Sequence, residues 1–174
     1  MKRSAAFFGA WTLVLALSAA GCGRVVGIPS SGAVVGAELN ESQRFTLKST
    51  DGSVVSLAQL LSQKRLVLIN FWATWCGYCV EEMPDFVKLQ EAQQDKGFTV
   101  LAVNVGESAA QASAFAKRHG LNFPVLLDED MAVSQAYGLV GIPSSYLVDS
   151  GGKVIGEYHG FTPELVSDVE SHLG

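Results

Sequence analysis

Cysteine is scarce in this sequence, and its placement excludes several kinds of site. The 174 residues include only three cysteines, Cys22, Cys76 and Cys79. A structural zinc site needs four ligands, and no second cysteine pair is present to supply them. Covalent haem attachment needs a histidine directly after the second cysteine, where this chain has Val80. The histidines are scattered, so we expect neither a metal nor a cofactor.

Charge is also sparse. Charged residues make up 17% of the chain, the formal net charge is −5, and the basic residues form no cluster. This pattern gives no support to nucleic-acid binding. Hydrophobic residues make up 48%, which favours a folded core over disorder. The length suits one domain, and no internal repeat is visible.

The first residues are typical of a targeting signal. A short basic start leads into a long apolar stretch, and small residues, with Ala19 where leucine is usual, precede Cys22. This end resembles a bacterial lipobox, which implies lipidation of Cys22 and an extracytoplasmic domain anchored to a bacterial membrane. An uncleaved helical anchor and a soluble secreted protein remain alternatives. We predict a signal peptide at 1–21, a flexible tether at 22–36 and a folded domain at 37–174.

The apolar pattern of that domain predicts alternating strands and helices. Two short strands should flank a turn at Asp51-Gly52 and form a β-hairpin. We expect strands at 45–47, 54–56, 66–71, 99–105, 123–127, 145–148 and 153–158, and helices at 57–61, after the cysteine pair to about 95, at 108–119, at 132–137 and from Thr162 onwards. This order indicates an α/β fold with a central mixed sheet and helices on both faces.

The cysteine pair lies where a buried strand gives way to a helix. A disulfide between Cys76 and Cys79 closes a very small loop, so it restrains the unfolded chain little, and a reactive role explains the pair better. A helix N-terminus favours thiolate over thiol. We predict that Cys76 attacks a substrate disulfide and that Cys79, one turn deeper, resolves the mixed disulfide.

Two stretches carry a family resemblance. Residues Phe71 to Cys79 resemble the active-site signature of thioredoxins, and Val80 to Pro84 resemble the TlpA/ResA/CcmG branch of membrane-tethered bacterial reductases. Residues Gly141 to Asp149 are similar to the family's cis-proline loop. The resemblance runs from about Gly36 to the C-terminus. It implies a thioredoxin-like fold with an N-terminal β-hairpin and a central insertion before Pro143.

The resemblance also implies a substrate surface. The bond between Ile142 and Pro143 should be cis, as only X–Pro bonds adopt that form cheaply, and should face the cysteines. The backbone of Ile142 would then offer strand-like hydrogen bonds to a substrate. Trp75, immediately before the nucleophile, is expected to belong to the docking surface, whereas Trp72 is expected in the core.

Proton transfer needs a group other than the usual one. Ordinary thioredoxins carry a buried aspartate at the position that matches Asn70, and asparagine cannot ionise. On a helix, Glu82 lies about 60° around the axis from Cys79, whereas Glu81 lies on the opposite side. Glu82 is therefore the candidate proton acceptor for Cys79, and burial would raise its pKa towards that of a useful base.

The expected function is reduction of disulfides in exported proteins, with apocytochrome c as the family's best-known substrate. A membrane protein would supply the electrons. Three alternatives stay open: a disulfide oxidase or isomerase, a thiol peroxidase, and a redox-inert binding lipoprotein. The residues between the cysteines, Gly77 and Tyr78, influence the redox potential without fixing the direction of electron flow.

Overall fold

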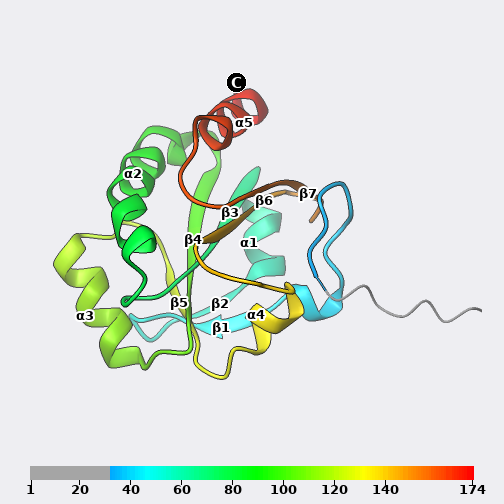
Figure 1. Ribbon diagram of the computed structural model, residues 1–174. Coiled ribbons are helices and arrows are strands. Elements are labelled where there is room, and N and C mark those ends of the chain that lie inside the picture. The colour runs from blue at the N-terminus through cyan, green and yellow to red at the C-terminus, as the bar shows by residue number, and fades with distance from the viewer. Residues whose placement is uncertain (1–31) are drawn as a thin grey trace, which may run out of the picture. The chain divides into compact units, whose positions relative to one another are not determined.

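A five-stranded mixed sheet forms the centre of the folded domain (Figure 1). The computed structural model describes residues 32–174, so the predicted signal peptide and Cys22 lie outside the described residues. The strand order is β5-β4-β3-β6-β7, in which β3 and β4 pair in parallel, as do β4 and β5, whereas β6 runs antiparallel to both β3 and β7. The strands are β3 (Leu66–Trp72), β4 (Phe98–Val105), β5 (Val125–Asp128), β6 (Ser144–Asp149) and β7 (Val154–Tyr158).

Helices cover both faces of this sheet, as predicted. The helices are α1 (Leu57–Gln63), α2 (Gly77–Gln93), α3 (Ala109–His119), α4 (Ala132–Ala136) and α5 (Pro163–Leu173). Apolar residues of α2, α3 and α5 join one core cluster, and those of α1 and α4 join the other. Figure 1 shows α2 and α3 on one side of the strands and α1 and α4 on the other.

The central strand β3 determines which residues face which core. All seven of its residues are buried. Because side chains alternate along a strand, Leu66, Leu68 and Trp72 join the core beneath α2, whereas Val67, Ile69 and Phe71 join the core beneath α1. Asn70 is two residues from Trp72, so its side chain points to the same face of the sheet, the face covered by α2.

The predicted β-hairpin is present as a small sheet of its own, and its turn contacts the edge of the central sheet. Strands β1 (Thr46–Lys48) and β2 (Val54–Ser56) form their own two-stranded antiparallel sheet. Its turn reaches the edge strand β5, where the Thr50 backbone N–H donates to the Val125 carbonyl over 2.8 Å. The segment between β4 and Pro143 contains α3, β5 and α4.

The last residues of the predicted tether contact the domain. The backbone N–H of Ala33 donates to the Tyr137 carbonyl over 3.1 Å, and that of Gly36 donates to Val154 over 2.8 Å. Residues 32–36 therefore pack against the fold that they precede. Among residues 32–174, no helix combines the length and apolar character needed to cross a bilayer.

Candidate active site

The cysteine pair begins helix α2 and forms a disulfide in this structure. Cys76 is the N-cap residue, and its Sγ accepts a hydrogen bond from the Cys79 backbone N–H over 3.2 Å. Cys76 retains 7% of its surface exposed, whereas Cys79 is fully buried. Cys76 is therefore the more exposed residue of the bonded pair, as the prediction that it attacks a substrate requires.

Large apolar side chains around Cys76 are exposed to solvent. Trp75 is 70% exposed, Tyr78 is 78% exposed and Val140 is 98% exposed. Trp72 is fully buried in the core beneath α2, as expected. Isolated exposed apolar residues are normal, but a group of them is typical of an interaction surface.

The loop before β6 faces the cysteine pair. The bond between Ile142 and Pro143 is cis, as the family resemblance implied. The Ile142 carbonyl oxygen lies 3.8 Å from Cys76 Sγ. The Ile142 backbone thus lies beside Cys76, as the predicted strand-like binding of a substrate requires.

A group of buried polar residues surrounds Glu82, which lies three residues after Cys79 in α2. Glu82 is 5% exposed, and its Oε1 accepts a hydrogen bond from Asn70 Nδ2 over 2.9 Å. Asn70 Nδ2 also donates to Ser145 Oγ over 3.0 Å, so both amide hydrogens of Asn70 are used. Burial raises the pKa of Glu82 from 4.5 to about 7, and the Asn70 hydrogen bond opposes this increase. Within residues 32–174, Glu82 Oε2 has no hydrogen-bond partner.

These properties suit a proton acceptor. A carboxyl group with a pKa near neutrality can both take and release a proton at physiological pH. Asn70 holds one oxygen of Glu82 and leaves the other unpaired. The structure thus places Asn70, which cannot ionise, in contact with Glu82. Glu82 is the glutamate that the helix period predicted to lie on the same side of the helix as Cys79. The role of Glu82 in catalysis stays a prediction.

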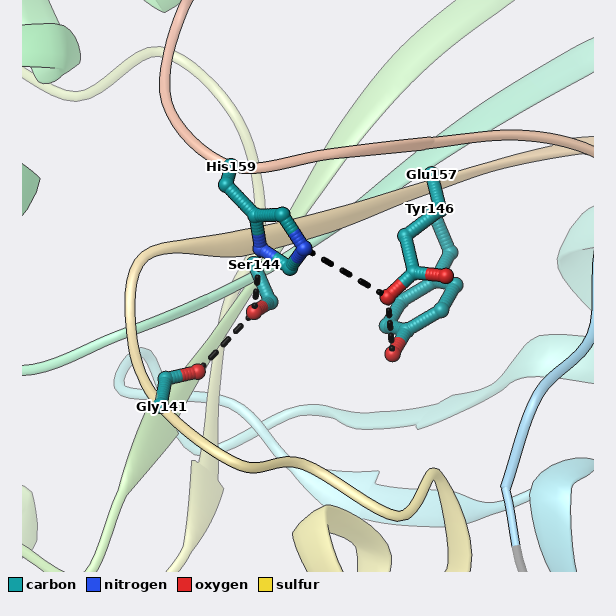
Figure 2. A network of polar contacts seen from close by, with 5 residues as sticks. All are labelled: Gly141, Ser144, Tyr146, Glu157 and His159. Atoms are coloured by element: carbon teal, nitrogen blue, oxygen red, sulfur yellow. Dashed lines mark hydrogen bonds and ion pairs between the residues drawn. The ribbon is translucent and has the colours of Figure 1, made fainter.

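A hydrogen-bond network supports the cis-proline loop (Figure 2). Ser144 Oγ donates to the Gly141 carbonyl over 2.9 Å, and His159 Nδ1 lies 3.3 Å from the same hydroxyl. Because the serine hydrogen is already used, His159 Nδ1 must be the donor. His159 Nε2 is 3.8 Å from Glu157 Oε1, which also accepts from the Tyr146 hydroxyl over 3.2 Å. The network joins strands β6 and β7 to the loop.

Two grooves flank the loop. One, of about 520 Å³, runs between α2 and the loop and is lined by Tyr78, Glu81, Glu82, Asp85, Pro143 and His159, among others. The other, of about 550 Å³, is mostly apolar and includes Trp75, Met131, Leu139 and Ile142. No lysine or arginine of the described residues lines either groove.

The sequence prediction missed the supporting residues Ser144, Ser145 and His159. Ser144 and Ser145 are buried polar residues at the start of a central strand, and that position was a usable signal. His159 gave no such signal, because its contact with Ser144 depends on the pairing of β6 with β7. In the described part of the chain, no group of three histidine, cysteine or acidic residues is arranged to hold a metal.

Comparison with known proteins agrees with this geometry. The Redoxin family matches residues 35–173. The chain belongs to the Redoxin family. It is 36% identical over 118 residues to the thiol-disulfide oxidoreductase ResA of Bacillus subtilis (strain 168), which covers 68% of this chain and 65% of that protein. The chain thus matches slightly less than two thirds of the length of this relative.

Solved structures give the same result. A thiol:disulfide interchange protein described as DsbE, from Chlorobium tepidum, is 31% identical with a TM-score of 0.71 over 82% of this chain and all of that one. The thioredoxin domain of a thiol-disulfide oxidoreductase from Bacteroides vulgatus is 26% identical with a TM-score of 0.73, again over 82% of this chain and all of that one. The fold is thioredoxin-like, and within the Redoxin family the chain belongs to the TlpA/ResA/CcmG group.

Proposed function

We propose that this protein is an extracytoplasmic thiol–disulfide oxidoreductase that reduces disulfides in exported proteins. The observation that carries the proposal is the asymmetric cysteine pair: Cys76, 7% exposed and beside the Ile142 carbonyl, and Cys79, which is fully buried. Apocytochrome c is the candidate substrate. The lipid anchor at Cys22 would hold the domain at the outer side of a bacterial membrane, where a membrane protein would return electrons to the pair.

The proposed reaction has two exchange steps. The Cys76 thiolate attacks one sulfur of the substrate disulfide, a mixed disulfide forms, and the other substrate sulfur leaves as a thiolate. Glu82 then takes the proton of the Cys79 thiol, and the Cys79 thiolate attacks Cys76 Sγ. The second substrate thiolate leaves, the substrate is a dithiol, and the enzyme holds the disulfide between Cys76 and Cys79.

The charges of the groove between α2 and the cis-proline loop support this direction of electron flow. Glu81, Glu82 and Asp85 line the groove beside the cis-proline loop, and no cationic lysine or arginine among the described residues accompanies them. Strong oxidants of the thioredoxin fold depend on a stabilised thiolate in their reduced form. An acidic groove works against that stabilisation. We therefore expect a reduction potential below about −180 mV, the value typical of protein disulfide isomerase.

A trapping experiment tests the proposal. Without a resolving thiol, the Cys79→Ser variant of the full chain should accumulate mixed disulfides on Cys76, which mass spectrometry identifies after acid quenching. A Cys76→Ser, Cys79→Ser variant is the matched control, since it keeps Cys22 and so reports any adduct formed there. Adducts on exported proteins support the proposal. Their absence would contradict it, and a potential above that of protein disulfide isomerase would favour an oxidase or isomerase.

A further inference from the structure

Glu107 is a buried carboxylate that the exchange reaction does not use. It is 6% exposed and lies two residues after the end of β4. Its oxygens accept three hydrogen bonds, from the Thr74 backbone N–H over 2.7 Å, from Thr74 Oγ1 over 2.5 Å and from Asn104 Nδ2 over 2.7 Å. Burying a carboxylate is unfavourable, and these three donors offset that cost.

The partners of Glu107 connect it to the active-site loop. Strands β3 and β4 are parallel, and Trp72 at the end of β3 lies opposite Asn104. Two residues beyond Trp72, the chain therefore reaches the same edge of the sheet as Glu107. Thr74 belongs to the segment 73–76 between β3 and α2, which also contains Trp75 and Cys76.

Glu107 contributes two of the hydrogen bonds that fix this segment. Within the segment, the Cys76 backbone N–H donates to the Ala73 carbonyl over 3.2 Å. The backbone N–H and the hydroxyl of Thr74 both donate to Glu107. Because Glu107 follows a different strand, both contacts attach the segment to the rigid sheet rather than to itself.

We propose that Glu107 is a positioning residue of the oxidoreductase. Through Thr74 it holds the segment 73–76 in the conformation that exposes Trp75 to substrate and keeps Cys76 Sγ beside the Ile142 carbonyl. Glu107 contacts no reacting atom, so it acts through the loop. The inference rests on the proposed function in one respect, the assignment of Cys76 as the attacking sulfur.

The test measures attack by Cys76 alone. A Cys22→Ser, Cys79→Ser parent leaves Cys76 as the single thiol of the chain. Rates of mixed-disulfide formation are measured with a peptide disulfide and with 2-hydroxyethyl disulfide, at a pH where the rate no longer increases and below the melting temperature of every variant. Since misplacement of a reacting group by about 1 Å can cost up to a hundredfold, we expect Glu107→Ala to slow the peptide reaction by about tenfold. The reaction with 2-hydroxyethyl disulfide, which needs no docking surface, should become slower by less than about threefold.

Three further variants separate positioning from general stability. Thr74→Ser keeps both donors and should match the parent, whereas Thr74→Val loses the hydroxyl and should fall between the parent and Glu107→Ala. Glu107→Gln should retain most of the rate, because its amide oxygen still accepts from the Thr74 N–H and the hydroxyl can reorient to accept. Glu129→Ala is the matched control, because Glu129 is an exposed carboxylate that accepts one backbone N–H, from Ala109 over 3.2 Å.

The outcomes are distinguishable. If Glu107→Ala and Thr74→Val lower the melting temperature but react with the peptide as fast as the parent, Glu107 is structural only and the inference is wrong. Should Glu107→Ala not fold, the rate of Thr74→Val alone decides. If the parent itself forms no adduct with either disulfide, Cys76 is not the attacking sulfur, and the proposed function and this inference fail together.

Discussion

Replacement of Glu82 by glutamine should change how the stability of the protein depends on pH. In the folded chain the pKa of Glu82 is raised to about 7 by burial, against an ordinary value of 4.5. Below pH 4.5 the carboxyl group is protonated in both the folded and the unfolded state. As the pH increases to 7, the unfolded chain releases this proton while the folded chain retains it. The contribution of Glu82 to the free energy of unfolding is therefore lost with increasing pH.

The size of the effect follows from the two pKa values. The difference between 4.5 and about 7 corresponds to roughly 3 kcal/mol of unfolding free energy. In the Glu82→Gln variant, the new side chain would keep the hydrogen bond from Asn70 Nδ2 but cannot ionise. Its unpaired amide group would cost about 1–3 kcal/mol at every pH. The free energy of unfolding of the variant at one pH is therefore less informative than the comparison with wild type at several pH values. The informative quantity is how the difference between the two free energies changes with pH.

The assay is denaturant unfolding of the oxidised protein at pH 4, 6 and 8.5, with the disulfide intact so that no cysteine of the pair titrates. The free energy of unfolding of Glu82→Gln, relative to that of wild type, should increase by roughly 3 kcal/mol from the lowest to the highest pH. Glu81→Gln is the matched control, because Glu81 is the more exposed neighbour on the same helix turn. Parallel curves for wild type and Glu82→Gln, within about 0.5 kcal/mol, would refute the argument that Glu82 is buried with a raised pKa.

Three further predictions concern the reaction and its surroundings. Glu82→Gln should slow release of a preformed mixed disulfide by about a hundredfold, the usual size of general base catalysis, and slow its formation much less; stopped-flow measurement of both steps checks this, and equal effects would contradict it. Trp75→Ala should lower kcat/KM for insulin by about tenfold without affecting a small disulfide; Val54→Ala, which removes another exposed apolar side chain, is the control. Asn70→Asp replaces a donor to Glu82 with a second carboxyl group, so it should raise the pKa of Glu82 further and lower the unfolding free energy by about 2–3 kcal/mol more at pH 8 than at pH 4; an equal loss at both pH values would show that only packing has changed.

Local patterns were sufficient to predict most of the elements and the disulfide between Cys76 and Cys79. The continuous apolar run of β3 predicted a strand buried on both faces, and all of its residues are buried. The helix expected at 108–119 is α3, which begins one residue later because Ser108 is its N-cap, and which ends at His119 with Gly120 as its C-cap. The helix period correctly separated the buried Glu82 from the more exposed Glu81. Each of these features depends on residues within a few positions of one another, where spacing alone determines which side chains share a face.

Contacts between distant segments were not accessible in the same way. The pairing of Asn70 with Glu82 needs β3 and α2 to lie against each other, and that of Thr74 with Glu107 needs two parallel strands to end at one edge. The hairpin was predicted, but the contact of its turn with the edge strand β5 joins residues far apart in the sequence. A one-residue change in strand register would alter each of these contacts while leaving the local sequence pattern unchanged.

The alternation of side chains along β3 also explains why an asparagine at position 70 suits a glutamate at position 82. Position 70 faces α2, where a carboxylate would be buried next to Glu82. Two carboxylates there could not both ionise at neutral pH, because like charges in a buried site raise one another's pKa. An asparagine instead supplies a hydrogen-bond donor, which holds Glu82 Oε1 and, within residues 32–174, leaves Oε2 unpaired. The predicted role of Glu82 as proton acceptor requires a single ionisable group here, and the amide of Asn70 orients that group without competing for its proton.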